Sequence, residues 1–488
     1  MAFLLDEQFG HLLRRAGFGA RPDELDRFRK MGIRSAVEDL LNFERVPDDV
    51  DTKIDVNAPG YVLTTRIAGA FLPASNIAAA RQRWLFRMVH SDRPLQEKMT
   101  LFWHNHFATA YTKLNGMLAT GEAARYLAAK PSDVGAGGVR GQIEMLRDNA
   151  LGNFEQILVN IAQDTAMLYW LDGQLNVRAK PQENFGREIM ELFTAGVGNY
   201  TEADVYAAAR VFTGWNLTRT LPNVFVYNAN QHETSEKTFS FPIYPDGNKT
   251  IPARGASQGM QDGLDFIAGL ARRPETGRYL ATKLYRFFVS EAGTVSQPFV
   301  DRIANVYLQS RYDMRAVMRA VLLSPEFWDD RAYYARFSWP AEFVVRTLKE
   351  VGWTGFSVND ALTPLLNMGQ TLYDPPDVAG WDLGTSWFST GAMLARMNFA
   401  ATLAANQRLK LVPNGTAVGN PSIGRTPEAL LSYVLDRLTP APFESGVRPE
   451  LLGYLRSSGV FPASDGQLQA KVPGLIHLIT GSPEYQLV

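Results

Sequence analysis

The sequence predicts a mainly α protein, a multi-helix globular body with a small β-containing excursion near residues 216–256. Over most of the chain, apolar residues recur at the three- and four-residue spacing that is typical of amphipathic helices. Between residues 216 and 256 this spacing gives way to alternating β-like pieces and to turn signals such as Pro245-Asp246-Gly247. The two patterns together favour helical parts on both sides of a short hairpin module.

The composition limits the class of protein further. Hydrophobic residues make up 46% of the 488 residues and charged residues 20%, which is typical of a globular chain with a large core. The formal charge is −1, from 49 Lys and Arg against 50 Asp and Glu, so no nucleic acid is expected as a partner. The sequence has no cysteine, which excludes disulfides, thiolate metal sites and cysteine nucleophiles. Any bound metal must therefore rely on His, Asp, Glu or backbone oxygen.

The N-terminal residues, Met1 to Glu7, have neither a basic start nor a long apolar run, so they do not resemble a secretory signal. No uncharged apolar run approaches the roughly 18 residues that a membrane span needs. We therefore expect a cytoplasmic protein without a membrane span, unless a partner carries it out of the cell.

The changes of pattern divide the chain into four predicted parts. A Pro-, Gly- and Ser-rich stretch separates the last of them from the others, which can also form one domain over residues 1–411. The parts are an N-terminal helical part (1–215), the excursion (216–256), a second helical part (257–411), and a linker with a small C-terminal helical subdomain (412–488).

Local signals mark where several helices begin. Pro22 stands where a helix can start, with two acidic residues in the first turn behind it. Asp164 is a candidate cap of a later helix. Thr201, followed by Asp204 three residues on, predicts a capping box.

A His-x-His motif, His104-Asn105-His106, ends the helix that is predicted to begin near Pro94. On an α-helix, side chains two residues apart point about 200° away from each other, whereas in an extended segment they point the same way. His104 and His106 can therefore hold a divalent metal jointly only if the helix ends near Trp103. The alternative is a pair of packed, hydrogen-bonded histidines among aromatic residues.

A second motif lies on the amphipathic helix that is predicted over residues 181–194. Asn184, Glu188 and Glu191 are spaced i, i+4 and i+7, so they form one polar stripe, with Arg187 beside it. Two carboxylates one turn apart, next to an amide and a guanidinium, can do acid–base work, bind a sugar hydroxyl or hold a metal. The alternative is a solvated helix face with ion pairs from Arg187 to the glutamates four residues away on either side.

Two further stretches leave alternatives open. Gly255-Ala256-Ser257-Gln258-Gly259 has the form of a nucleophile elbow, but no alternation of strands and helices surrounds it, so a loop is predicted. Residues 369–381 contain two prolines and two glycines, which also predicts a loop. With Asp377 and Trp381, that loop can bind and stack a sugar or a base, or it can be a packed lid that seals the core.

Five segments carry a family resemblance and occur in the expected order: Arg14-Arg15-Ala16-Gly17-Phe18-Gly19, Trp103-His104-Asn105-His106-Phe107, residues 181–194 with Gly198-Asn199-Tyr200-Thr201, Phe212-Thr213-Gly214-Trp215, and Pro375-Pro376-Asp377-Val378-Ala379-Gly380-Trp381. Together they resemble the large bacterial family catalogued as domain of unknown function 1800, over nearly the whole chain. The family's helix motif is similar to Glu-Asn-Phe-Ala/Gly-Arg-Glu-Leu/Met-Leu/Met-Glu-Leu-Phe. The matching positions here are Glu183, Asn184, Phe185, Arg187, Glu188, Glu191, Leu192 and Phe193.

The resemblance also implies a usual partner. Genes of this family often lie beside genes for a second family with a sulfatase-like or phosphatase-like fold, which frequently bears a twin-arginine export signal. Unlike some members, this sequence shows no export signal of its own. It also has Glu233 after His232, where the family pattern leads us to expect Asp, and this weakens a role for that pair. The site that the resemblance favours combines His104, His106, Asn184, Glu188 and Glu191, closed by Trp215 and the 374–388 loop.

The expected function is that of a hydrolase that acts on a polysaccharide or another hydroxyl-rich polymer. Glu188 and Glu191 are the candidate catalytic residues, as acid and base or as ligands of a divalent metal, the candidate cofactor, together with His104 or His106. A pair on one helix is unusual for glycosidic chemistry, so Asp164, Asp172 or Asp377 is an alternative second acid. The candidate substrate-binding residues are Asn184, Arg187, Trp215, Asp377 and Trp381.

Two other classes of function are considered. In the first, the protein is a non-catalytic partner of the sulfatase-like protein, and the polar motif is a buried network that fixes helix packing. In the second, it is a redox or oxygen-using metalloprotein, which is the least favoured class because the chain lacks a Glu-x-x-His motif and any thiolate.

Overall fold

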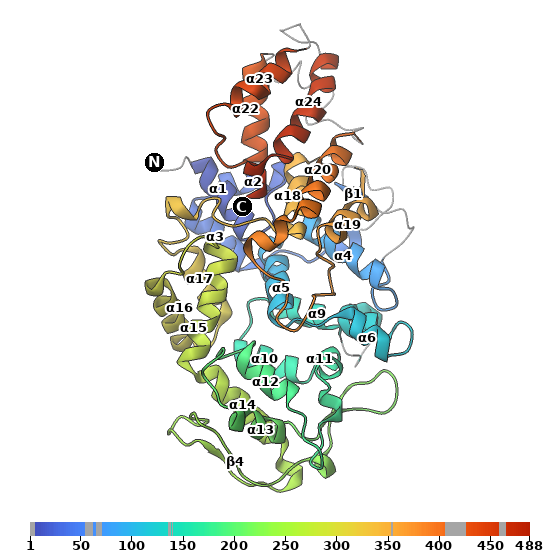
Figure 1. Ribbon diagram of the computed structural model, residues 1–488, viewed down its shortest axis with the longest axis vertical. Coiled ribbons are helices and arrows are strands. Elements are labelled where there is room, and N and C mark those ends of the chain that lie inside the picture. Colours follow the sequence, from blue (N-terminus) through green and yellow to red (C-terminus); the bar gives the residue numbers. More distant parts are fainter. Residues whose placement is uncertain are drawn as a thin grey trace.

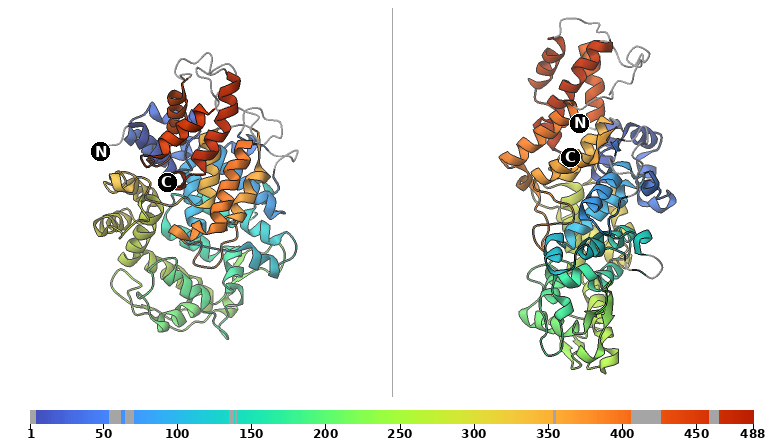
Figure 2. Two further views of the ribbon diagram at one scale, coloured as in Figure 1. Left: turned by 45° about the horizontal axis from the view of Figure 1, so that its top comes forward. Right: turned by 90° about the vertical axis from the view of Figure 1, so that its right-hand side faces the viewer.

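Helices follow one another along the described part of the chain, and the strands there form only three short pairs, so the prediction of a mainly α protein is confirmed. The structure, a computed structural model, describes residues 5–53, 62–64, 71–134, 138, 140–352, 355–405, 426–457 and 465–488. Figure 1 shows an elongated molecule with the C-terminal helices at one end and the excursion at the other. Two further views show the same arrangement (Figure 2).

The N-terminal part consists of short and medium helices around α4 and α5, which pack against each other. α5 also packs against α3 and α9, and α4 packs against α7. The helices of this part are α1 (Leu5–Arg15), α2 (Pro22–Arg29), α3 (Ile33–Leu41), α4 (Ile77–His90), α5 (Pro94–His106), α6 (Tyr111–Met117), α7 (Glu122–Ala128), α8 (Pro131–Val134), α9 (Gln142–Asp148), α10 (Phe154–Ala162), α11 (Thr165–Trp170), α12 (Asn184–Glu191) and α13 (Glu202–Val211).

The excursion contains two short antiparallel strand pairs, as the alternating pattern predicts. After the second pair, residues Gly255 to Gly259 form a loop with one 3-10 turn that leads into a helix, so the predicted loop is confirmed. A third pair is parallel and joins segments far apart in the sequence, β1 (Leu63–Thr64) and β6 (Phe356–Ser357). The pairs of the excursion are β2 (Trp215–Leu217) with β3 (Phe225–Tyr227), and β4 (Lys237–Thr238) with β5 (Thr250–Ile251).

The second helical part is centred on α18, in which every residue is buried. α15 ends in a π-helical turn, Tyr285–Val289. The C-terminal helices α22, α23 and α24 pack against one another, and α24 packs against α20. The predicted linker at 412–425 lies outside the described residues. The helices are α14 (Met260–Arg272), α15 (Pro274–Leu284), α16 (Gln297–Gln309), α17 (Met314–Leu322), α18 (Pro340–Val351), α19 (Val358–Asn367), α20 (Thr390–Ala405), α22 (Pro427–Leu438), α23 (Val447–Arg456) and α24 (Asp465–Thr480).

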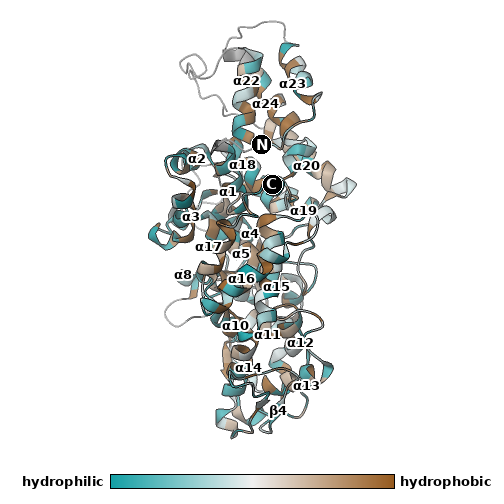
Figure 3. Cartoon of the chain, turned by 90° about the vertical axis from the view of Figure 1, so that its left-hand side faces the viewer, coloured by the Kyte–Doolittle hydropathy of each residue, from teal (hydrophilic) through white to brown (hydrophobic). Residues whose placement is uncertain are grey.

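Most helices carry both hydrophilic and hydrophobic residues, as expected for amphipathic elements around a shared core (Figure 3). Within the described residues, none of the helices combines the length and the apolar character that are needed to cross a membrane.

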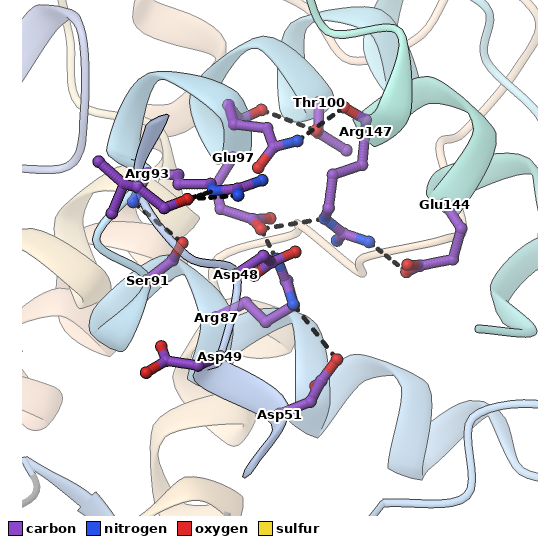
Figure 4. Close-up of polar contacts among 12 residues, drawn as sticks. Asp48, Asp49, Asp51, Arg87, Ser91, Arg93, Glu97, Thr100, Glu144 and Arg147 are labelled. Carbon is purple, nitrogen blue, oxygen red and sulfur yellow. Dashed lines mark hydrogen bonds and ion pairs between the residues drawn. The ribbon is translucent and has the colours of Figure 1, made fainter. Parts of the chain in front are cut away.

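A buried network of charges fixes the first half of α5 (Figure 4). Glu97 of α5 accepts hydrogen bonds from Arg87 of α4 at 2.7 Å and from Arg147 of α9 at 2.9 Å. Glu144 of α9 accepts from Arg147 and, at 2.7 Å, from Arg83 of α4. Burial raises the pKa of Glu97, but the positive charges of Arg147 and Arg87 lower it by more, so the carboxylate stays ionised. Because each charge would be costly if it lost its partner, the network ties α5 to α4 and α9.

Candidate functional site

The His-x-His motif lies entirely on a helix, because α5 continues through His106. The extended geometry that a joint metal site requires is therefore absent, and the two imidazoles point to different sides of the helix. His104 is fully buried, and neither of its ring nitrogens has a hydrogen-bond partner within the described part of the chain. Its ring packs edge-on against those of Trp84 and Trp381, with centroids 5.5 and 5.3 Å away. Burial lowers the pKa of His104 to about 3, so the imidazole is neutral.

His106 uses both of its ring nitrogens within the protein. Its Nε2–H donates to the backbone carbonyl of Phe193 at 3.0 Å, and its Nδ1 accepts a hydrogen bond from the ammonium of Lys283 at 3.2 Å. Burial and the charge of Lys283 both lower the pKa of His106, which keeps it in this neutral form. The residues present do not fit a metal at the His-x-His motif. Across the described residues, no group of three or more His, Asp or Glu side chains is placed to hold a metal ion.

The carboxylate helix is shorter than the predicted 181–194, since α12 covers only Asn184–Glu191. It ends in a widened turn in which the N–H of Phe193 donates to the carbonyl of Glu188, five residues back, at 3.1 Å. The last carbonyls of a helix have no intrahelical partner. Here the carbonyl of Phe193 accepts from His106, and that of Leu192 accepts from Lys283 at 3.5 Å. The cation of Lys283 also complements the negative end of the helix dipole.

Glu188 and Glu191 lie one turn apart on the half-buried side of α12 but have different partners. The hydroxyl of Tyr200 donates a hydrogen bond to Glu191. Glu188 has no hydrogen-bond partner among the described residues. Burial raises the pKa of Glu188, and the negative charge of Glu191 raises it further, against the opposing effect of Arg187. The two carboxylates thus differ in their surroundings, since a phenol holds Glu191 and no such partner in the described part of the chain holds Glu188.

α15 adds a phenol and an amine, Tyr279 and Lys283, which are spaced one helical turn apart. Burial and the charge of Glu191 raise the pKa of Tyr279 to about 12. Burial lowers the pKa of Lys283 to about 8. Neither residue was singled out from the sequence. The only sequence signal is that each of them carries a polar group next to the apolar residues of the predicted helix, and that signal is weak.

Of the remaining polar candidates on α12, Arg187 has a structural role and Asn184 lies at the candidate site. Arg187 forms two hydrogen bonds of 2.8 Å with Glu202 and an ion pair of 3.5 Å with Glu183, so it clamps α12 to α13 and does not pair with Glu191. Asn184 is exposed, and its amide donates to Asp172 at 3.4 Å. Asp172 is therefore the alternative acid that the fold brings next to the polar stripe.

The other two alternative acids have local roles. Asp164 is buried and caps α11 by accepting from the N–H of Met167 at 2.8 Å, and burial raises its pKa to about 7. Asp377 is exposed and accepts from the N–H of Ala379 in its own loop at 2.8 Å. These contacts give neither residue a link to Glu188 or Glu191.

The two candidate stacking residues are buried. Trp215 packs against Phe212 and Phe225, with centroid distances of 5.3 Å for both. The backbone N–H of Trp381 donates to the side-chain carbonyl of Asn105 at 2.6 Å, and the indole ring of Trp381 packs against His104. A β-carbon on Gly380 would lie 2.4 Å from Asn105, so only glycine permits this close crossing. The loop is thus a packed lid over the end of α5, which is one of the two predicted alternatives.

The end of α5 links the two halves of the predicted site. Asn105 contacts the lid, and His106 contacts the end of α12 and, through Lys283, α15. Where these helices meet, the protein has a cluster of two carboxylates, two phenols and an amine. The groups belong to Glu188, Glu191, Tyr200, Tyr279 and Lys283.

A family model described as "Protein of unknown function (DUF1800)" matches residues 11–487, and the chain belongs to that family, as the resemblance predicts. No curated protein and no solved structure matches the chain.

Proposed function

We propose that the protein is a hydrolase that acts on a hydroxyl-rich polymer such as a polysaccharide, by acid–base chemistry at Glu188 and Glu191. The observation that carries this proposal is the unequal pair itself. Glu188 has a raised pKa and no hydrogen-bond partner among the described residues, whereas Glu191 is held by the hydroxyl of Tyr200. Environments that separate two carboxylates in this way favour one as general acid and the other as general base.

In the proposed reaction, Glu191 accepts a proton from a water molecule, whose oxygen attacks the anomeric carbon. Glu188 gives its proton to the leaving oxygen as the bond from carbon to that oxygen breaks. Direct attack by water needs the two carboxyl groups about 6.5–9.5 Å apart, and side chains that start about 5–6 Å apart at Cβ must diverge from the helix to reach that separation. Asn184 and Asp172, joined by a hydrogen bond beside the pair, are available to bind substrate hydroxyls.

The test compares Glu188→Gln and Glu191→Gln with Glu183→Gln, an exposed glutamate that directly precedes α12. We expect the wild type to release reducing ends from at least one member of a panel of polysaccharides. Each catalytic variant should lose about 100-fold or more in rate, because general acid–base groups contribute that much. The Glu183→Gln variant should stay within about twofold. Retained activity in Glu188→Gln, with the fold intact in all three variants, would contradict the proposal.

A second candidate function, a non-catalytic partner of a sulfatase-like protein, is favoured by a different observation. α20 exposes Leu394 and Met397, with 58% and 47% of their surface accessible, three residues apart and so on one side of the helix. Leu366 on α19 and Leu478 on α24, the helices that pack against α20, are also exposed. Exposed apolar patches of this kind mark protein interaction surfaces.

This second function is tested by gel filtration of the purified chain with the purified sulfatase-like protein. If the partner binds α20, the two proteins elute together, and Met397→Glu abolishes the complex because it buries a charge in the interface. Met117→Glu is the matched control, since Met117 on α6 is exposed to the same extent, 47%. Equal loss in both variants, or no complex with the wild type, would contradict this function.

A further inference from the structure

Arg14 and Arg15, from the N-terminal motif that the proposed function does not use, are buried between α1, α5, α18 and the C-terminal segment. Arg14 donates to the hydroxyl of Thr439 at 2.8 Å. Arg15 donates from Nη2 to the backbone carbonyl of Ala332 at 2.6 Å. Neither guanidinium forms an ion pair with a carboxylate of the described residues. The motif therefore places two positive charges inside the protein without dedicated counter-charges.

Positive charges outnumber negative charges in this part of the interior. Glu342 forms ion pairs with both Lys98 and Arg336, and Glu350 forms an ion pair with Arg346 at 2.9 Å. Glu291 lies 3.4 Å from Arg336. Six buried cations thus face three carboxylates among the described residues. The cations are Arg14, Arg15, Lys98, Arg336, Arg346 and Arg396, and the carboxylates are Glu291, Glu342 and Glu350.

Arg15 is the least compensated of these cations. The charges of Arg14, Lys98 and Arg336 each lie over an aromatic ring, at 4.5, 4.8 and 4.9 Å from the centroids. Arg15 has no such ring among the described residues, and its Nε and Nη1 groups have no hydrogen-bond partner. Burial lowers the pKa of Arg15, and the charge of nearby Arg336 lowers it further, against the weaker opposing effect of Glu342. Because a guanidinium does not give up its proton in a protein, this charge needs an anion and cannot be neutralised by titration.

We propose that this junction binds a small inorganic anion of the size of chloride, held by the free N–H groups of Arg15 between the charges of Arg15 and Arg336. Free N–H donors of buried arginines are the groups that an anion requires, and they make charge-assisted hydrogen bonds. Arg14, Arg15 and Arg336 are each at most 2% exposed, and a site this far from solvent favours a monatomic ion over the larger phosphate or sulfate. The site is separate from the carboxylates of α12 and does not depend on the proposed hydrolase.

Thermal unfolding tests the proposal with chloride as the ligand. The full chain is compared in chloride, sulfate and gluconate at equal ionic strength. A ligand that binds only the folded state raises the midpoint by mass action, by about 2–3 °C for a chain of this length at a hundredfold excess over Kd. We expect chloride to raise the midpoint of the wild type over gluconate, and sulfate, which stabilises folded proteins by exclusion from their surface, to raise the midpoints of the wild type and Arg15→Met equally. The Arg15→Met variant should lose the chloride response, because the excess charge and the free donors are gone.

Arg331→Met is the matched control, since Arg331 is 90% exposed at the surface and should keep the wild-type response. An equal chloride response in Arg15→Met and the wild type, or no response in the wild type, overturns the proposal. If Arg15→Met does not fold, crystals of the wild type grown in bromide decide the question. An anomalous peak within hydrogen-bond distance of Arg15 supports the site, and its absence overturns it.

Discussion

Glu188 and Glu191 are chemically identical, and the protein makes them different by what it places beside each. Glu191 receives the hydroxyl of Tyr200, while Glu188 is half-buried beside another negative charge. A carboxylate in the position of Glu188 is costly to ionise, and folding must overcome that cost. Such costs are common at functional sites, where activity and stability compete.

Substitution of Glu188 is therefore expected to stabilise the protein at neutral pH. Because the folded pKa is raised above the unfolded value, the folded state binds more protons, and stability falls as the pH rises from the unfolded pKa through the folded one. Glu188→Gln removes this loss, so its unfolding midpoint should exceed that of the wild type at pH 7. The two should converge near pH 4, where Glu188 is protonated. Thermal scans at both pH values provide the measurement, and a variant less stable than the wild type at pH 7 would refute this account.

Residue by residue, the sequence identified the polar stripe but not all of its partners. The spacing of Asn184, Glu188 and Glu191 placed them on one side of a helix from periodicity alone. Lys283 was missed because its importance comes from contacts with His106 and with the end of α12, which lie far away in the sequence. Of the two ion pairs considered for Arg187, the one with Glu183 forms, but in place of Glu191 the partner is Glu202 of α13, which offers both carboxylate oxygens at 2.8 Å.

At the level of helices, close packing of α12 on α13 holds the carboxylate pair in place. The contact passes through Gly186, where a β-carbon would lie 3.0 Å from the β-carbon of Ala208 and 3.1 Å from the backbone nitrogen of Ala209. These distances leave no room for a branched side chain, so the separation of the two helices is set by the absence of a side chain at Gly186.

Gly186→Val should push α12 away from α13 and destabilise the protein by about 1–3 kcal/mol, as overpacked cores do. The midpoint of urea-induced unfolding measures this effect. Gly116→Val is the control, because Gly116 on α6 has no atom within 4 Å of its added β-carbon, and the change should stay within about 0.5 kcal/mol. Equal midpoints for Gly186→Val and Gly116→Val would show that the close contact does not limit the packing.

Local signals predicted the starts of helices better than their ends. The capping box of Thr201 and Asp204 and the cap by Asp164 are confirmed, since each depends on neighbours in the sequence. The predicted helix over residues 181–194 ends early, whereas the helix that begins at Pro94 does end with the His-x-His motif. The last turn of α5 is held by the contact of His106 with Phe193, a tertiary contact that periodicity does not reveal.

Across the whole molecule, the buried charge network makes folding depend on pH. Burial raises the pKa of Glu144, but Arg147 and Arg83 lower it by more, to well below its usual range. Glu342, beside Arg336 and Lys98, has its pKa lowered to about 2 despite burial. For carboxyls with depressed pKa values, the stabilisation is fully present above the unfolded value of about 4.3 and is lost as the pH falls through the folded value. We therefore expect acid unfolding to set in below about pH 4.

Glu144→Gln should cost about 1.5–3 kcal/mol at pH 7, because Arg83 and Arg147 lose a shared charged partner, although each keeps a second carboxylate, Asp51 and Glu97 respectively. The cost should shrink as the pH falls below about 4, because the unfolded wild type then binds a proton at Glu144 while the folded wild type still keeps that carboxyl ionised. Urea unfolding at pH 7 and near pH 3 measures the difference, with the exposed Glu450→Gln as the control. A cost that is independent of pH would mean that packing, not charge, is lost.

The class of fold and the order of its elements were predictable from periodicity, and the family from five separated motifs. What was not predictable is which distant segments meet. The contact of Trp381 with Asn105 and that of Arg15 with Ala332 both join segments hundreds of residues apart. The division of the chain into domains stays a prediction.

α5 carries Glu97 of the charge network near its start and Asn105 and His106 of the candidate site at its end. The same helix, α5, thus belongs both to the buried charge network and to the candidate site. If the proposed hydrolase activity is correct, drift in its substrate preference is therefore expected on α12 and α15, which bring side chains to the site from outside the network. Changes on α5 would be filtered out by loss of the folded protein before any new activity could be selected.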